Sequence, residues 1–466
     1  MKRILIATLI FLIMLFAVTP HFLGFSFLHL GHALQVATSL SAKLACSAKF
    51  ISNMEHEQIV KDLSSYSPAT KLVSLSYFED TKKVEARLLG LSNATAIYNE
   101  HTGCYLTYPE VAKLDVTSKQ NFQASSNKTW PDGKQLKYVD LAVQAAVNRV
   151  IRKDNESDLD TRALIVVYEG ELVAEAYGKG FESHTPLLGW SMGKSLTAIM
   201  LGRLEQLDKV NRNETKLFDE WQDDRQQISL SSLLQMTSGL AFDETYAPGS
   251  DATHMLFTAP SASDVALQSK INFNQGEHFS YSSGTTNLLT RYIHQVLGND
   301  VNNTATFLNN EVFSPLSIDS AVFETDASGV LVGSSYIYAS ARDWARLGLL
   351  MVNQGLVNGK TLLSKSWVAD ATTPNTSNNE KAYGYQFWLN KGDEELRWPS
   401  LPEDAYAMMG NRHQSVMMLP SEKLVMVRLG WTAGDYPMEQ NYKQLVDAVI
   451  DANAPILPME QVNNKN

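Results

Sequence analysis

The run from Leu188 to Leu196 constrains this chain more than any other stretch, because it places a serine and a lysine three residues apart. These residues, Ser191 and Lys194, begin a segment whose apolar spacing predicts a helix over residues 191–207. Positions i and i+3 share one face of a helix, so the lysine amine can reach the serine hydroxyl. A serine hydroxyl becomes a strong nucleophile when a nearby base takes its proton, and a lysine serves when burial lowers its pKa.

The same serine also fits a second pattern. Residues 189–193 form G-x-S-x-G, which is the nucleophile elbow of α/β-hydrolases. In that alternative, Ser191, a later aspartate and His413 form the catalytic triad. An elbow follows a strongly apolar strand, whereas residues 181–186 are mixed, and the chain lacks the regular strand–helix alternation of a parallel sheet. The two patterns thus agree on the nucleophile and predict different bases and folds.

Composition excludes some classes of partner. The chain has 466 residues, of which 44% are hydrophobic and 19% are charged, with a formal net charge of −11. This is long enough for several domains, and the acidic balance argues against a nucleic-acid partner. Cysteine and histidine do not cluster with metal-ligand spacing. We therefore expect an enzyme that needs neither a metal nor a cofactor.

The N-terminus predicts export. Lys2 and Arg3 precede an apolar stretch over 4–18, and apolar character resumes over 22–28. A basic start followed by such a run is typical of a signal peptide or a signal anchor, and residues 4–30 are long enough to cross a bilayer. We expect residues 1–30 to be this segment. The rest of the chain would then be periplasmic or held at the inner membrane, outside the cytoplasm.

Residues 31–135 are predicted to form an exported N-terminal module followed by a linker. The module has strand-like alternation over 73–77 and 84–88, and the polar stretch 117–134 is the linker. The chain has two cysteines, Cys46 and Cys104, both in this region. Two cysteines in an oxidising compartment are expected to pair, and a closed loop of about 58 residues stabilises by roughly 4 kcal/mol.

Residues 136–455 are predicted to form the catalytic domain, with 456–466 as a tail. Alternating apolar segments predict a hairpin near each end of this domain, and mostly helical and loop sequence lies between the hairpins. We expect an α+β fold: an antiparallel sheet whose first and last strands meet, flanked by helices, with an inserted helical lobe. The expected hairpin strands are 163–168, 172–177, 415–419 and 424–429, and the expected helices include 141–151, 341–353 and 438–452.

Two further positions are candidates for the site. Tyr281 lies in a turn-rich loop, and a phenol near a lysine is driven towards phenolate, which can carry a proton between Ser191 and a leaving group. Before the last hairpin, a strand edge can offer a backbone N–H to an oxyanion. We expect this donor to be Gln414, acting together with the N–H of Ser191.

These features, in this order, resemble the serine β-lactamase and penicillin-binding-protein superfamily, and in particular its class C-like branch of esterases, D-amino-acid peptidases and 6-aminohexanoate-dimer hydrolases. The resemblance covers roughly residues 136–455 and implies the β-lactamase/transpeptidase-like fold. It rests on Ser191-Met192-Gly193-Lys194, on Tyr281-Ser282-Ser283, and on the supporting stretches 233–240, 341–348 and 383–388. It implies that Ser191 is acylated, that Lys194 and Tyr281 handle protons, and that Ser283 is a polar group in the cleft.

The third motif of the superfamily departs from its pattern of Lys or His, a small residue and Gly. The matching positions are Asn411, Arg412 and His413, followed by Gln414, so Arg412 is the candidate for the positive charge that binds substrate. We therefore expect slow turnover of β-lactams. The sequence predicts an exported serine hydrolase of a small ester, amide or peptide. The alternatives are the α/β-hydrolase and a catalytically silent relative that binds a peptidoglycan-like or protein ligand through the same cleft.

Overall fold

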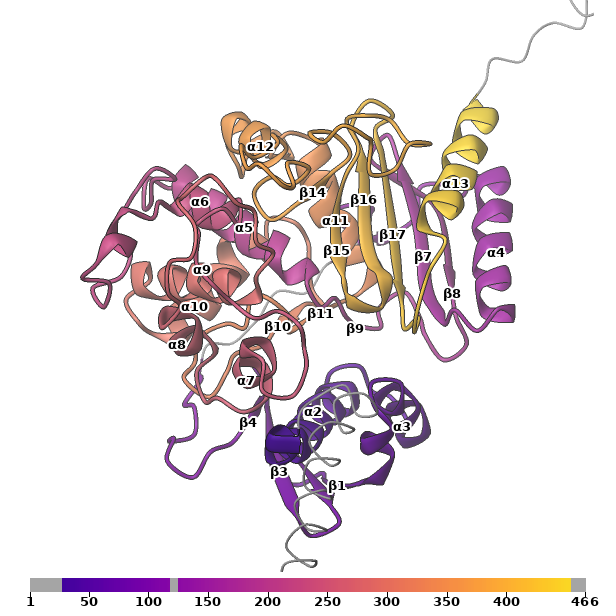
Figure 1. Cartoon of the computed structure of the whole chain (residues 1–466). Helices are drawn as coiled ribbons and strands as arrows, with labels where there is room; N and C mark the ends of the chain where they lie inside the picture. The colour runs from indigo at the N-terminus through magenta and orange to yellow at the C-terminus, as the bar shows by residue number, and fades with distance from the viewer. Residues whose placement is uncertain (1–26, 118–124, 454–466) are drawn as a thin grey trace, which may run out of the picture.

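The computed structural model describes residues 27–117 and 125–453. Figure 1 shows three parts: a large sheet with helices on both faces, a helical lobe beside it, and an N-terminal module below both. The large sheet has the order β14-β15-β16-β17-β7-β8, and every neighbouring pair in it is antiparallel. Its strands are β7 (Thr161–Tyr168), β8 (Glu171–Tyr177), β14 (Trp388–Leu389), β15 (Tyr406–Gly410), β16 (Gln414–Leu419) and β17 (Leu424–Gly430).

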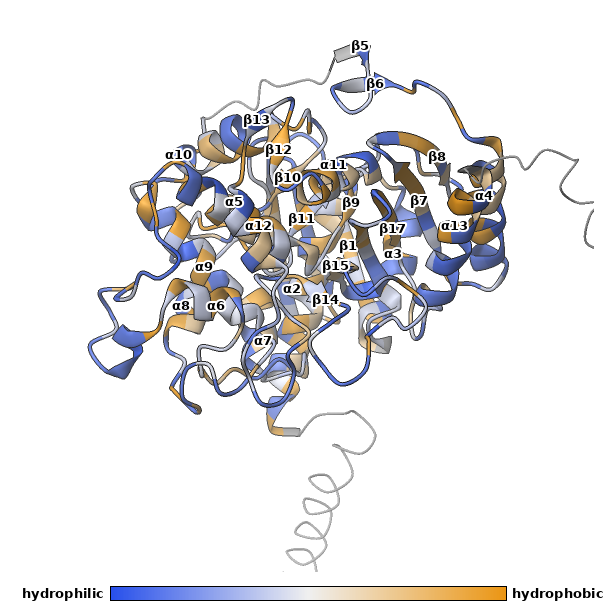
Figure 2. Ribbon diagram, turned by 90° about the horizontal axis from the view of Figure 1, so that it is seen from above, coloured by the Kyte–Doolittle hydropathy of each residue, from blue (hydrophilic) through white to orange (hydrophobic). Residues whose placement is uncertain are grey.

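The two predicted hairpins form the centre of this sheet. β17 pairs with β7 and places Val427 opposite Ile165, so the first and last strands of the catalytic region meet, as predicted. Almost every residue of β7, β16 and β17 is buried, and Figure 2 shows apolar residues in the region of β7 and β8. Three helices supply the cover: α4 (Leu141–Glu156) and α13 (Met438–Asn453) pack together on one face, and α11 (Ala341–Val352) contacts β16, β17 and β7 on the other.

The helical lobe is organised around α5 (Met192–Gln206), which is buried over nearly its whole length. A three-stranded sheet of order β10-β11-β9 joins the lobe to the large sheet, and its last member runs directly into α5. The strands are β9 (Leu187–Leu188), β10 (Val322–Phe323) and β11 (Ile337–Ala339). The other elements of this region are α6 (Leu230–Leu234), α7 (Asp251–Phe257), α8 (Ala262–Leu267), α9 (Ser283–Val296), α10 (Val301–Phe307), β12 (Leu356–Val357), β13 (Lys360–Thr361) and α12 (Lys365–Ala371).

The N-terminal module is a helix packed on a four-stranded antiparallel sheet. The helix is α2 (Leu30–Phe50), and the predicted strands at 73–77 and 84–88 form the first two strands of the sheet. The expected disulfide is present: Cys46 in the helix is bonded to Cys104 in the last strand. The remaining elements are α3 (His56–Ser64), β1 (Val73–Phe78), β2 (Lys83–Leu88), β3 (Ser92–Asn99) and β4 (Gly103–Leu106).

A buried ion pair ties this module to the catalytic region. Lys43 in α2 is paired with Glu324, which directly follows β10, and both side chains are buried. Glu324 also accepts hydrogen bonds from the Ser47 hydroxyl at 2.8 Å and from the Cys104 backbone N–H at 2.6 Å. One carboxylate thus binds the helix, the last strand of the module and, through its own chain, the three-stranded sheet next to α5.

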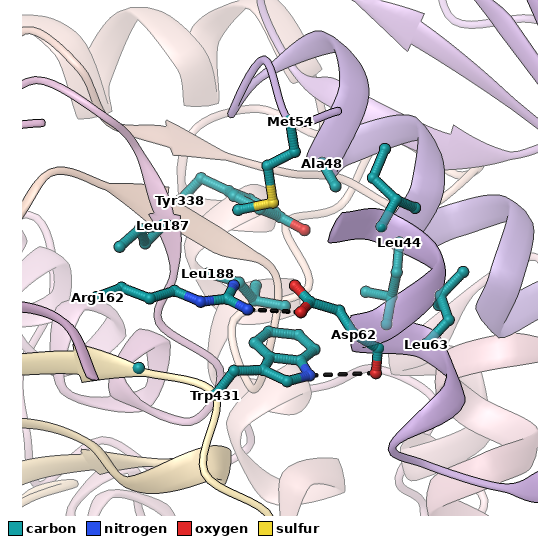
Figure 3. Close-up of a pocket in the computed structure, with 12 residues that line it drawn as sticks. Leu44, Ala48, Met54, Asp62, Leu63, Arg162, Leu187, Leu188, Tyr338 and Trp431 are labelled. Atoms are coloured by element: carbon teal, nitrogen blue, oxygen red, sulfur yellow. Dashed lines mark hydrogen bonds and ion pairs between the residues drawn. The ribbon is translucent and has the colours of Figure 1, made fainter. Parts of the chain in front are cut away.

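A second ion pair lies beside an apolar pocket between the module and the catalytic region (Figure 3). Arg162 at the start of β7 donates to Asp62 in α3 at 2.5 Å, and the Trp431 indole donates to the Asp62 carbonyl at 3.2 Å. Leucines from α2, α3 and β9 line the pocket together with Met54, Ile59 and Tyr338. The module and the catalytic region therefore share a buried interface.

Part of the stretch predicted as a linker is docked on the catalytic region. It forms two short strands, β5 (Ser125–Thr129) and β6 (Gly133–Gln135), and Trp130 between them is buried. Arg346 of α11 holds this turn by donating to the carbonyls of Pro131 and Gly133, each at 2.9 Å.

The predicted signal segment lies mostly outside the described residues. Within residues 27–117 and 125–453, no helix has the length and apolar character needed to cross a bilayer.

The ion pair between Lys43 and Glu324 yields a stability prediction. We expect Glu324→Gln to lower the free energy of unfolding by about 3–5 kcal/mol, because it leaves the Lys43 amine buried without its carboxylate. Glu169→Gln is the matched control: Glu169 pairs with Lys423 on the surface, where the side chains are 54% and 66% exposed, and its loss should cost less than about 1 kcal/mol. Urea unfolding of the full chain measures both values, and equal losses would contradict the prediction.

Candidate active site

Ser191 lies where a short strand turns into the central helix of the lobe. It follows β9 and is the N-cap residue of α5, so its side chain is held at the first helical turn. Trp190 before it has φ +49°, in the left-handed region that non-glycine residues rarely adopt. The Trp190 ring is buried and packs against Tyr66 of the N-terminal module and Trp431, with ring centres 6.1 and 6.5 Å away. Aromatic packing from two parts of the chain thus holds the turn that presents the serine.

Lys194 is brought to Ser191 by the predicted helical spacing. Its Nζ lies 3.2 Å from Ser191 Oγ, 3.0 Å from Ser283 Oγ and 3.2 Å from the carbonyl oxygen of Ser334. The side chain is 1% exposed, and these three partners are neutral oxygen atoms. Burial lowers the pKa of Lys194 to about 8, although the negative charge of Glu244 acts in the opposite direction. At pH 7 about one molecule in ten therefore carries this lysine as a neutral amine, which is a base.

Tyr281 also belongs to this cluster. Its ring centre lies 4.8 Å from Lys194 Nζ. Trp388 is stacked on the ring at 5.3 Å, and Tyr383 packs edge-on against it at 6.2 Å. Burial raises the pKa of Tyr281, while a hydrogen bond with the Ser191 side chain lowers it to a lesser degree. This direction is opposite to the expected shift towards phenolate, because the cost of burying a phenolate exceeds the stabilising effects around it. The site therefore holds a neutral phenol beside a lysine that gives up its proton more easily.

Ser283 is held by a carboxylate that the sequence did not single out. Ser283 begins α9, and both its backbone N–H and its hydroxyl donate to Glu244, at 2.8 and 2.5 Å. The Tyr246 hydroxyl donates to the same carboxylate at 2.8 Å. Glu244 lies in the irregular segment between Gly239 and Gly249, where no periodicity or motif spacing distinguishes it from other surface acids. Only the folded arrangement shows that it supports the lysine through Ser283.

Gln414 lies next to the turn that carries Ser191. It begins β16 and pairs with Gly410 at the end of β15. A Cβ on Gly410 would lie 2.1 Å from the carbonyl oxygen of Gly189, so this strand end touches the backbone two residues before Ser191. The Gln414 side chain is engaged elsewhere, since its amide bonds both the N–H and the carbonyl of Gly430. Its backbone N–H is the part that remains a candidate oxyanion donor.

Arg412 does not join this cluster. Its guanidinium donates to the backbone carbonyl of Ser65 at 3.0 Å and lies 4.3 Å from the centre of the Tyr66 ring. The side chain predicted to bind substrate instead holds the N-terminal module against the strand end. The sequence does not show this, because Ser65 and Arg412 are 347 residues apart.

The α/β-hydrolase alternative is wrong. His413 shares a hydrogen bond of 2.6 Å with the carbonyl of Gly434 and lies beside Tyr436, and the large sheet is antiparallel throughout. Four aromatic residues near the motifs divide by burial. Trp190, Tyr385 and Phe387 are buried in the core, whereas the half-buried Trp388 forms a wall against Tyr281. In the described part of the chain, no three His, Cys, Asp or Glu side chains are grouped so as to hold a metal ion.

Comparison with known proteins agrees with this architecture. The model of the Beta-lactamase family matches residues 147–448. The 6-aminohexanoate-dimer hydrolase of Paenarthrobacter ureafaciens is 23% identical over 256 residues, which span 51% of this chain and 64% of that protein. A Bacillus anthracis structure provisionally assigned as a 6-aminohexanoate-dimer hydrolase superposes with a TM-score of 0.58 at 20% identity, over 73% of this chain and 90% of the other. A family VIII carboxylesterase gives a TM-score of 0.51 at 13% identity, over 68% and 100%.

The electrostatics of Lys194 predict a pH profile. We expect the rate of Ser191 modification by a fluorophosphonate to rise about tenfold per pH unit below pH 8 and to level off above it, because neutral Lys194 accumulates as pH rises through its pKa of about 8.

Glu244→Gln tests the origin of this profile. Removing the charge that raises the pKa of Lys194 should move the inflection to lower pH. Labelling rates from pH 6 to 10, followed by intact mass, measure both effects. An inflection that stays in place in the variant would contradict the assigned coupling.

Proposed function

Because the chain belongs to the Beta-lactamase family, we propose that it is an exported serine hydrolase that cleaves an ester or amide bond through an acyl-enzyme on Ser191. The observation that carries the proposal is the 3.2 Å contact between Ser191 Oγ and the buried amine of Lys194. The pKa of this amine is lowered to about 8, so the amine can act as the base that takes the proton of the Ser191 hydroxyl.

In this mechanism neutral Lys194 takes the proton of Ser191 while Oγ attacks the substrate carbonyl. The backbone N–H groups of Ser191 and Gln414 hold the resulting oxyanion. Tyr281 then gives its phenolic proton to the leaving group and is reprotonated from the Lys194 ammonium, so the proton lost by the serine leaves with the alcohol or amine. The neutral state of Tyr281 supports its role as this donor.

Release of the acyl group uses the same groups in reverse. Water adds to the acyl carbonyl and gives a proton to the tyrosine–lysine pair. The C–Oγ bond breaks, and the proton returns to Ser191 with release of the carboxylic acid. Every group in this cycle is supplied by the protein, so we propose that it works with neither a metal nor a cofactor.

The substrate is proposed to be a small ester, amide or peptide. Similar proteins include one named a 6-aminohexanoate-dimer hydrolase and one named a carboxylesterase. Trp388 beside Tyr281 gives the leaving-group side an aromatic wall. Because Arg412 binds Ser65, the positive charge that would hold a β-lactam carboxylate is directed away, which supports slow β-lactam turnover.

Export is proposed from two features outside the catalytic cluster. The basic and apolar N-terminal segment is typical of export signals, and the Cys46–Cys104 disulfide is typical of an oxidising compartment. We assign residues 136–455 as the hydrolase domain and residues 31–135 as an exported module that packs on it.

Labelling and turnover of the full chain test the mechanism together. We expect one fluorophosphonate adduct on the wild type and none on Ser191→Ala, with labelling at pH 7 reduced by about 10²–10⁴ in Lys194→Ala and unchanged in the control His413→Ala. Tyr281→Phe should reduce turnover of an amide more than that of an activated ester, because the amide leaving group needs the proton.

Two outcomes would contradict this proposal. Near-normal rates in Lys194→Ala would remove the assigned base. Absence of any adduct on folded wild-type protein would favour the catalytically silent relative that binds a ligand through the same cleft.

A further inference from the structure

Arg428 is a buried cation that the proposed reaction does not use. It lies in β17 with 0% of its side chain exposed, and its hydrogen bonds go to neutral oxygen atoms. The compensating charge is one hydroxyl away, because Thr161 Oγ1 accepts from Arg428 at 2.9 Å and donates to Asp154 at 2.7 Å. Burying a guanidinium without a directly bonded carboxylate costs free energy, so packing alone does not account for an arginine here.

The guanidinium binds the loop that precedes Gln414. One terminal nitrogen of Arg428 donates to the carbonyl of Arg412 at 2.8 Å and to that of His413 at 3.1 Å. These two loop residues have φ of +62° and +60°, so two successive non-glycine residues hold the left-handed conformation. Each costs on the order of 1 kcal/mol and persists only where the surroundings impose it.

The second of these carbonyls shares a peptide unit with the candidate oxyanion donor. The C=O of His413 and the N–H of Gln414 belong to one planar trans peptide and point in opposite directions. A hydrogen bond that fixes the carbonyl therefore fixes the direction of the N–H. The other side of Gln414 is fixed as well, since its side-chain amide bonds the backbone of Gly430.

Gly430 makes this arrangement possible. A Cβ at this position would lie 2.4 Å from the central carbon of the Arg428 guanidinium. Glycine at the end of β17 leaves the space in which the guanidinium turns towards the loop.

We propose that Arg428 is a positioning residue of the oxyanion hole: by holding the carbonyl of His413 it aims the N–H of Gln414 at the substrate oxygen. This inference rests on the proposed function. In this proposal Arg428, which lies in β17, affects the stabilisation of the transition state through the His413–Gln414 peptide. Arg428 itself does not contact the substrate.

The test compares an ester with the thionoester of the same acid and alcohol. An oxyanion hole binds a developing O⁻ better than a developing S⁻, because sulfur is larger and accepts hydrogen bonds more weakly. The ratio of kcat/KM for the ester to kcat/KM for the thionoester therefore reports how well the N–H donors are oriented towards the oxyanion. We expect Arg428→Met to lower kcat/KM for the ester by about 10²–10³ and to reduce the ester-to-thionoester ratio at least about tenfold. Arg428→Lys should restore part of the ratio, because its ammonium still donates to the carbonyl.

Arg346→Met is the matched control. Arg346 is also buried and also donates to two backbone carbonyls, those of Pro131 and Gly133, in the docked turn between β5 and β6. Unlike Arg428, it is paired directly with a carboxylate, that of Asp343 at 2.9 Å. It should lower the thermal midpoint and leave the ratio unchanged. An unchanged ratio in folded Arg428→Met would overturn the inference.

Two further arms keep the result decisive. If Arg428→Met does not fold, Thr432→Val replaces it, since the Thr432 hydroxyl accepts a hydrogen bond from Arg428 at 2.6 Å. An ester-to-thionoester ratio lowered about threefold supports the inference, and an unchanged ratio overturns it.

If wild-type protein neither cleaves the ester nor accepts a fluorophosphonate at Ser191, the proposed function fails first. An active wild type with an insensitive ratio overturns only the role of Arg428.

Discussion

The burial of one amino group away from water organises the cluster around Ser191. Lys194 Nζ contacts oxygen atoms from three places: Ser191 at the start of α5, Ser283 at the start of α9, and the Ser334 carbonyl just before β11. Each of these elements must be in place for the amine to be shielded from water, and this desolvation is what lowers the pKa of Lys194. The chemistry of the site is therefore a property of the assembled lobe and sheets.

The N-terminal module is part of this assembly. It packs Tyr66 against Trp190, the residue before Ser191, and places Lys43 beside Glu324 in the segment that leads to β11. Arg412 reaches the module from the strand end that precedes Gln414. Three of the connections that shape the catalytic turn thus come from outside the stretch matched by the family model, residues 147–448.

Local features of this protein were readable from its sequence, and distant polar contacts were not. Helical spacing identified the contact between Ser191 and Lys194, and apolar alternation identified the hairpins at both ends of the sheet, because both signals reside in neighbouring residues. The roles of Glu244 and of the Lys43–Glu324 pair were not predicted, because a buried polar contact between distant segments produces no periodic pattern in the sequence. The direction of the Tyr281 pKa was also missed, because it depends on how completely the ring is buried.

The buried pair of Lys43 and Glu324 also orders events during biosynthesis. The two residues are 281 positions apart, so the ribosome makes Lys43 roughly 15–60 s before its partner at typical synthesis rates of about 5–20 residues per second. During that interval the whole module has been synthesised, while Glu324, which pairs with Lys43, and Trp431, which packs on Tyr66, have not. The emerging chain therefore exposes part of the apolar face of the module until the last third of the protein has been made.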